Sequence, residues 1–174
     1  MTRRLSAEEK RARYMTLATM VTYNKVTGDL TWKSGCGGRY ENQVAGFIAD
    51  RNIGYLKVKH KGIRYFCHII AWIVATGYYP ENQIDHINGD RLDNSFSNLR
   101  DVTAKINSRN APRAYKSNTP YVGVQRYGNK WVAQCCGNHL GSFDCLGQAI
   151  KVRKAEEIRV GGFTQRHSLR PTLV

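Results

Sequence analysis

The sequence predicts an α+β protein made of two small domains. Short runs of alternating apolar residues, separated by turns that contain glycine, indicate antiparallel strands. An almost wholly apolar segment, His68–Thr76, indicates a buried helix that ends at Gly77. A stretch bounded by Pro112 and Pro120 is typical of a linker, and a length of 174 residues suits one or two modest cores.

The N-terminal third is predicted to hold a basic helix and two hairpins. The helix spans residues 3–20, with Ser6 as its N-cap and Glu9 completing a capping box, and it defines a first segment, residues 1–22. Tyr23 to Lys33 forms a hairpin around Thr27-Gly28-Asp29. Residues 54–59 and 63–66 are strands joined by a turn at residues 60–62.

The middle of the chain is predicted to be a hairpin followed by a helix. Residues 83–86 are a short strand, residues 88–98 a polar loop, and residues 99–102 the returning strand. Thr103 caps a helix that starts at Ala104 and ends before Pro112.

The C-terminal part, residues 121–174, is predicted to be three strands and a helix. The strands are residues 121–127, 130–135 and 138–143. Asp144 then caps a helix with an apolar face made of Leu146, Ala149, Ile150 and Ala155.

The composition points to a nucleic-acid partner and away from a membrane. The formal net charge is +14, and residues 106–174 alone hold eleven basic and three acidic residues, or +8. Such an excess suits a polyanion. The longest apolar run, Ile69–Ala75, is too short to span a bilayer, and the N-terminus lacks the apolar core of a signal peptide. Five cysteines without a C-x-x-C pair are typical of reduced thiols, so we expect a cytoplasmic protein.

The candidate chemistry lies at Asp85 and His86, followed by Asn98 and Asn107. If the hairpin folds back and the helix crosses it, Asp85 and Asn107 can share one divalent cation through oxygen ligands. His86, on the other face of the strand, can deprotonate a water. Asn98 can accept from one imidazole nitrogen and leave the other as the base. This set is sufficient to hydrolyse a phosphodiester.

The constellation resembles the HNH endonucleases with their ββα-metal fold, and especially the phage HNH homing endonucleases. The resemblance runs from about Tyr23 to Asn110, within a domain of residues 23–111. The segments that carry it are Gly28-Asp-Leu, Ala45-Gly46, Gly54-Tyr-Leu, Cys67-His68-Ile-Ile-Ala-Trp72, Ile84-Asp-His-Ile-Asn-Gly, Asp93-Asn94, Asn98-Leu-Arg and Thr103-x-Lys-Ile-Asn107.

This resemblance implies a role for each polar residue. His86 would be the general base, Asn98 would position it, and Asp85 with Asn107 would bind one Mg2+, for which Mn2+ can substitute. Asn110 is the alternative to Asn107, although the Thr-x-Lys-Ile-Asn pattern favours Asn107.

Other residues near the pattern receive plainer interpretations. We expect His68 to be a structural histidine at the start of a buried helix, and Asp93 and Asn94 to stabilise their loop. Because adjacent strand residues point to opposite faces, Cys135 and Cys136 make a poor pair of ligands, and no structural zinc is expected.

Residues 121–174 resemble the AP2-type DNA-binding domain of plant factors and some phage HNH enzymes. Tyr121-x-Gly-Val124, Lys130-Trp131, Leu140-Gly-x-Phe143 and the Ala149–Ala155 helix carry this resemblance. The sequence departs from that family at Gln125, Gln134 and Cys136. The resemblance therefore implies the fold of the domain more strongly than it implies which bases the domain contacts. The predicted DNA contacts are Arg100, Arg109, Arg113, Lys116, Gln125, Arg126, Tyr127, Lys130 and Gln134.

The sequence therefore predicts a metal-dependent, sequence-specific DNA endonuclease of the homing type. Its partner would be double-stranded DNA, with no membrane and no small-molecule cofactor, and a monomer is favoured. One alternative is a DNA-binding regulator with an inactive nuclease domain, and a second is an RNA-binding module, which a major-groove type of sheet disfavours.

Overall fold

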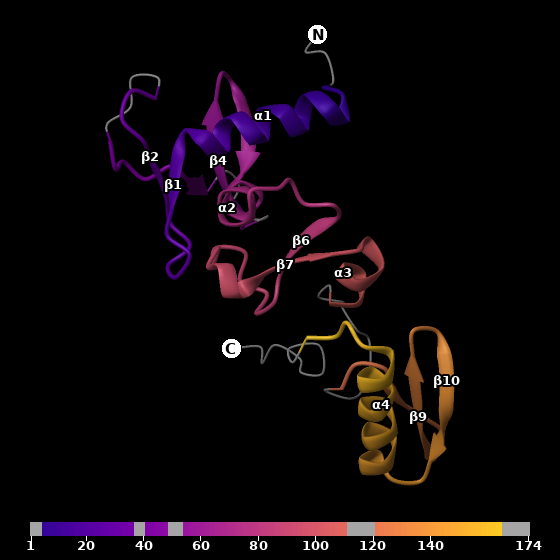
Figure 1. Ribbon diagram of the computed structural model, residues 1–174. Coiled ribbons are helices and arrows are strands. Elements are labelled where there is room, and N and C mark those ends of the chain that lie inside the picture. The colour runs from indigo at the N-terminus through magenta and orange to yellow at the C-terminus, as the bar shows by residue number, and fades with distance from the viewer. Residues whose placement is uncertain (1–4, 37–40, 49–53, 111–120, 165–174) are drawn as a thin grey trace. The chain divides into compact units, whose positions relative to one another are not determined.

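The computed structural model describes residues 5–36, 41–48, 54–110 and 121–164, which form two compact units, Met1–Val102 and Thr103–Val174 (Figure 1). Each unit is described by itself. The predicted linker, residues 112–120, lies outside the described residues, and so do Arg113 and Lys116. None of the described helices is long and apolar enough to cross a membrane.

The described residues of the first unit form two α-helices and seven short strands. Its elements are α1 (Ala7–Thr19), β1 (Val21–Tyr23), β2 (Leu30–Trp32), β3 (Phe47–Ile48), β4 (Leu56–His60), β5 (Ile63–Phe66), α2 (Cys67–Thr76), β6 (Gln83–His86), a 3-10 turn (Phe96–Asn98) and β7 (Leu99–Val102). Three antiparallel sheets result, β1–β2, β3–β4–β5 and β6–β7. The predicted strands and the apolar helix are confirmed, whereas β3 was not predicted.

Helix α1 starts as its sequence predicts and packs on α2. The Ser6 hydroxyl accepts from the Glu9 N–H, and the Glu9 carboxylate accepts from the Ser6 N–H, which completes the capping box. Tyr14 and Leu17 of α1 are fully buried with Ile70 of α2, and the Tyr14 hydroxyl accepts from the Phe66 N–H at 3.1 Å. The apolar core of the unit therefore forms around α2, directly behind β6.

The β6–β7 hairpin is the element that presents the polar residues. Its antiparallel register pairs Asp85 with Arg100 and His86 with Leu99. Side chains of paired strand residues share a face, so Asp85 and Arg100 lie on one face and His86 on the other. Ile84 and Leu99 pack with Ala71 of α2 in a small second core cluster. The hairpin is thereby anchored to the helix beneath it.

The second unit contains α3 (Ala104–Asn110), β8 (Val124–Tyr127), β9 (Lys130–Cys135), β10 (Asn138–Phe143) and α4 (Leu146–Val160). The sheet order is β10–β9–β8, and Val124, Ala133 and Ala149 form the core between sheet and helix. In Figure 1, α4 runs along β9 and β10.

Two details of α4 differ from the prediction. Its N-cap is Cys145 without a side-chain cap, while Asp144 forms an ion pair with Lys130 at 3.4 Å. Ala155 is exposed, and Arg153 is the buried residue on that turn. At 3.6 residues per turn, position 155 is rotated far from position 149, whereas position 153 is its near neighbour. Arg153 tolerates burial because Glu157 pairs with it at 2.7 Å.

Candidate active site

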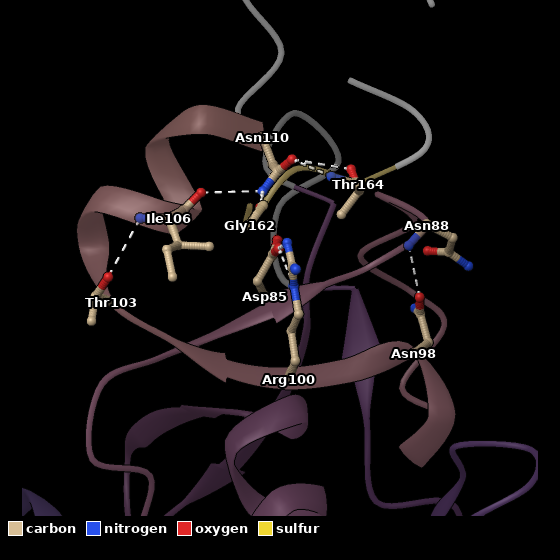
Figure 2. Close-up of polar contacts among 9 residues, drawn as sticks. All are labelled: Asp85, Asn88, Asn98, Arg100, Thr103, Ile106, Asn110, Gly162 and Thr164. Atoms are coloured by element: carbon tan, nitrogen blue, oxygen red, sulfur yellow. Dashed lines mark hydrogen bonds and ion pairs between the residues drawn. The ribbon is translucent and has the colours of Figure 1, made fainter. Parts of the chain in front are cut away.

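Asp85 is held by an arginine from the neighbouring strand. Both Nε (3.1 Å) and Nη2 (2.7 Å) of Arg100 donate to the same carboxylate oxygen, Oδ2, as Figure 2 shows. The Asp85 side chain is 7% exposed and that of Arg100 is 24% exposed. A nearly buried carboxylate requires a cation, and here Arg100 supplies it. Arg100 was predicted to contact DNA; in this structure its head group is engaged by Asp85.

His86 is buried beside an amide and two rings. Its Nε2 lies 3.1 Å from Oδ1 of Asn94. The rings of Tyr55 and His68 lie 5.9 and 5.2 Å from its own, centroid to centroid. Burial lowers the pKa of His86 below its ordinary value, although the Asn94 hydrogen bond and the nearby carboxylates, Asp85 first, oppose that shift. The imidazole is therefore neutral at neutral pH, which is the form that a general base requires.

His68 has the character of a structural residue. It is buried, stacks on Phe66 at 5.2 Å, and meets the His86 ring edge-on. Burial, followed by the proximity of His86, lowers the pKa of His68 to about 3. A histidine that stays neutral throughout the physiological range packs as an aromatic side chain, in agreement with the expectation from its position on the apolar helix.

Asn98 braces the loop that follows His86. Its Oδ1 accepts from the Asn88 N–H at 2.8 Å (Figure 2). Its Nδ2 donates to the Asp93 carbonyl, also at 2.8 Å. Its own carbonyl accepts from the Ile87 N–H at 2.8 Å. This differs from the predicted hydrogen bond between Asn98 and the imidazole, because the amide that contacts the ring belongs to Asn94. Asn98 determines the shape of the loop around His86.

The same loop is stabilised by Asp93, as its sequence predicts. Its two carboxylate oxygens accept from the Asn88 amide at 2.8 Å and from the Ser95 N–H at 3.0 Å. Hydrogen bonds from Ser95, the largest influence, hold the pKa of Asp93 below its ordinary value. Hydrogen bonds from its own side chains therefore order part of the loop from Asn88 to Asn98.

Helix α3, in the second unit, carries Asn107, Arg109 and Asn110. The Asn110 amide is buried and saturated: Nδ2 donates to the carbonyls of Ile106 (3.1 Å) and Gly162 (2.8 Å). Its Oδ1 accepts from the N–H (2.8 Å) and the hydroxyl (3.1 Å) of Thr164 (Figure 2). The Asn110 side chain therefore links α3 to residues 161–164 through hydrogen bonds. Because both ends of the Asn110 amide are already hydrogen-bonded, Asn107 is the better candidate for a metal ligand.

Of the remaining predicted DNA contacts that the structure describes, Arg109 is half-buried and the others are exposed, namely Gln125, Arg126, Tyr127, Lys130 and Gln134. Strand pairing places Tyr127 opposite Lys130 and Gln125 opposite Val132, so Gln125, Tyr127, Lys130 and Gln134 share one face of the sheet. Arg126 pairs with Trp131 on the other face, where its guanidinium lies 5.8 Å from the indole ring. Arg109 donates to the Gly161 carbonyl at 3.1 Å and lies over Phe163. The predicted set is therefore divided between two faces.

Sequence reasoning missed one contact of His86 and two cations that lie over aromatic rings of the same cluster. Asn94 contacts the ring itself, while Lys57 and Arg91 lie over the Phe66 and Tyr55 rings at 4.7 and 4.9 Å. Alternating lysines in the strand around Lys57 were a usable signal for a charged face. No comparable signal distinguishes Asn94 from the other asparagines of its loop.

The side chains suit a hard cation with few protein ligands. Within the described residues, no three His, Cys, Asp or Glu side chains gather as a metal site. One carboxylate and one amide oxygen are the ligand types of Mg2+, which keeps several waters and takes phosphate oxygens from its substrate. Asp85 fits this chemistry provided that the cation competes with Arg100 for the carboxylate.

Comparison with known families decides what this hairpin is. Residues 65–109 match the HNH endonuclease family model. The match begins in β5 and covers α2, β6, β7 and nearly all of α3, which are the elements described above. No curated protein and no solved structure matches the chain. An HNH domain is therefore present, and it supports a nuclease that acts on nucleic acid and, as HNH nucleases generally do, uses a divalent metal.

Proposed function

We propose that this protein is a metal-dependent, sequence-specific DNA endonuclease of the homing type, of the kind that phages encode. The single observation that carries the proposal is the buried Asp85–His86 pair on a hairpin inside the HNH match, with the imidazole neutral. A neutral base next to an ionised carboxylate is the minimum that phosphodiester hydrolysis requires.

Each residue receives one role in this proposal. His86 removes a proton from the attacking water, and Asn98 holds the loop that surrounds the ring. Asp85 and Asn107 would hold one Mg2+, which when bound neutralises charge on the scissile phosphate. If Asp85 binds a cation, Arg100 would no longer be needed as its counter-charge and would be able to contact the phosphate. Lys57 and Arg91, which lie over the Phe66 and Tyr55 rings, add positive charge to the same unit.

The second unit is proposed to hold double-stranded DNA. A three-stranded sheet backed by one helix resembles the AP2 arrangement, and a major groove is wide enough for such strands. Gln125, Tyr127, Lys130 and Gln134 share an exposed face and are the proposed contacts there. Arg109, Arg113, Lys116 and Arg126 are proposed as further DNA contacts.

Plasmid cleavage tests this function directly. With Mg2+ or Mn2+, the full chain should convert supercoiled plasmid to nicked or linear forms, and EDTA should stop the reaction. His86→Ala should bind DNA and cut it about 10^2- to 10^4-fold more slowly at the same enzyme concentration. If wild-type protein binds plasmid and never cuts it with either metal, the endonuclease proposal fails.

The alternative function, a DNA-binding regulator with an inactive nuclease domain, is favoured by one observation. The Asp85 carboxylate already has a cation on Oδ2, in the form of Arg100. If this pair cannot open, no metal binds there. Direct measurement of Mn2+ binding to wild type and Asp85→Asn separates the two functions, because a regulator would show no difference between them.

A truncated chain is a poor test of the DNA-binding role. Ending the chain near Arg113 would remove Gly162 and Thr164, which hold the Asn110 amide of α3. Loss of cleavage could then arise from a displaced α3 instead of lost DNA contacts. Point substitutions in the intact chain are therefore the sharper experiment.

A further inference from the structure

The most deeply buried polar side chain of the loop is Asn94, which is 2% exposed. Its Oδ1 faces His86 Nε2 at 3.1 Å. An amide oxygen can only accept, so a neutral His86 carries its proton on Nε2 in this contact. The unprotonated ring nitrogen is then Nδ1, which is the nitrogen able to remove a proton from water.

Asn94 is held in place by the β1–β2 hairpin, far away in the sequence. The Tyr23 hydroxyl donates to the Asn94 carbonyl at 2.7 Å. Two residues later, the Phe96 N–H donates to the Lys25 carbonyl at 2.9 Å. The loop thus accepts one hydrogen bond from the hairpin at Asn94 and donates one to it at Phe96. This hairpin precedes the HNH match at residues 65–109.

Gly28, in the turn of that hairpin, permits the close approach. Its φ is +84°, and a Cβ built there would lie 2.6 Å from both the Asn94 carbonyl carbon and the Ser95 nitrogen. Those neighbours are backbone atoms, which cannot rotate away as a side chain can. Any residue larger than glycine would push the loop, and Asn94 with it, away from its present position.

We propose that Asn94 is the positioning residue of His86, and that Tyr23 and Gly28 hold Asn94 against the imidazole. This inference rests on the proposed role of His86 as general base. The hairpin outside the family match then becomes part of the catalytic apparatus. Misplacing a reacting group by about 1 Å costs on the order of 100-fold in rate, so a displaced ring is sufficient to reduce turnover.

Asn94→Leu tests the contact itself, since leucine has a similar size and no acceptor. We expect kcat on saturating DNA to fall about 10- to 100-fold, while the Kd for the same duplex stays within about twofold because no DNA contact is removed. Asn94→Asp restores an accepting oxygen and should recover most of the lost rate. A purely structural Asn94 would not be rescued by a carboxylate.

Nitrogen-15 NMR of the His86 ring gives a readout that does not depend on cleavage. In wild type we expect a pyrrole-type Nε2 and a pyridine-type Nδ1, with His86→Ala identifying the signals. In Asn94→Leu we expect the two nitrogens to exchange these types or to show a mixture of both tautomers. In Asn94→Asp we expect the wild-type assignment. An unchanged tautomer in Asn94→Leu would overturn the proposal.

Gly28→Ala tests the hairpin, with Gly77→Ala as its matched control. Gly77 has a φ of +83°, close to that of Gly28, but nothing lies within 4 Å of a Cβ placed there. Both variants incur the same backbone strain, and only Gly28→Ala collides with Asn94. We expect Gly28→Ala to lower kcat and disturb the His86 tautomer, and Gly77→Ala to do neither at a temperature where both are folded.

Tyr23→Phe is a milder variant, which we expect to fold even where Gly28→Ala fails to fold. It removes one hydrogen bond and should lower kcat several-fold. Equal rates for Gly28→Ala and Gly77→Ala, together with a wild-type rate for Tyr23→Phe, would contradict the role of the hairpin. Failure of the proposed function looks different: wild-type protein would cut no DNA, or His86→Ala would cut as fast as wild type. The tautomer measurement would still report on the Asn94 contact in either case.

Discussion

The β6–β7 hairpin and the β8–β9–β10 sheet both carry polar side chains, but the two regions differ in how deeply those side chains are buried. Asp85, His86 and Asn94 of the first region are buried and hydrogen-bonded. Gln125 and Gln134 of the second region are exposed. Burial fixes orientation and shifts pKa values, which chemistry requires, whereas exposure leaves amides ready to meet a partner. A substitution should therefore act on rate in the first region and on binding in the second.

The largest expected effect concerns the proposed metal ligands. Asp85→Ala or Asn107→Ala should leave no measurable cleavage, because the scissile phosphate loses its counter-cation. Mn2+ binding, followed by electron paramagnetic resonance, should weaken in both variants. Arg100→Gln is the informative companion, since it removes the cation that competes for Asp85, and we expect it to bind Mn2+ more tightly without DNA. Wild-type Mn2+ binding by Asp85→Ala would contradict the ligand assignment.

Loss of the base should come next. His86→Ala should reduce the cleavage rate by about 10^2- to 10^4-fold, the usual scale for general-base catalysis. Its affinity for a DNA duplex should stay near that of wild type, because the side chain is buried. Single-turnover rates and a gel-shift titration on one DNA would check both statements. If His86→Ala bound DNA poorly but cut it at a normal rate, the hairpin would be a binding region and the contrast with the exposed sheet would be wrong.

Single substitutions on the exposed sheet should have smaller and separable effects. Lys130→Ala, if Lys130 neutralises one phosphate, should weaken binding to all sequences alike and reduce the slope of log K against log salt by about 0.9. Gln125→Ala or Gln134→Ala, if these residues read bases, should cost about 1–3 kcal/mol at particular positions of the site. A selection experiment on randomised duplexes, repeated at two salt concentrations, distinguishes these outcomes.

The smallest predicted effect is a pH dependence of stability from His68. Its folded pKa of about 3 lies below the ordinary value of 6.5, so the unfolded chain binds the proton between these values. The stability that this residue contributes is complete above pH 6.5 and decreases as the pH falls toward 3. At pH 5.5 the loss is about 1.4 kcal/mol. Urea unfolding of wild type and His68→Gln should show a shallower pH dependence in the variant.

Local signals in the sequence were sufficient to predict the helices, most of the strands and the positions of Asp85 and His86. The Ser6–Glu9 capping box, the glycine after α2 and the strands around Asp85 and Leu99 all depend on neighbouring residues. For the same reason, alternation along a strand was enough to place Asp85 and His86 on opposite faces. The domain boundaries and the approach of Asn107 to Asp85 stay predictions.

Only the tertiary structure decided which side chains meet. Asn94 and Asn98 are chemically identical and four residues apart, and Asn94 faces the imidazole because Tyr23, 71 positions away, holds its carbonyl. The pairing of Arg100 with Asp85 likewise became visible only when the strand register placed the two residues opposite each other. Residue type states what a side chain can do, but contacts between distant segments select the partner, because packing and register are properties of the whole fold.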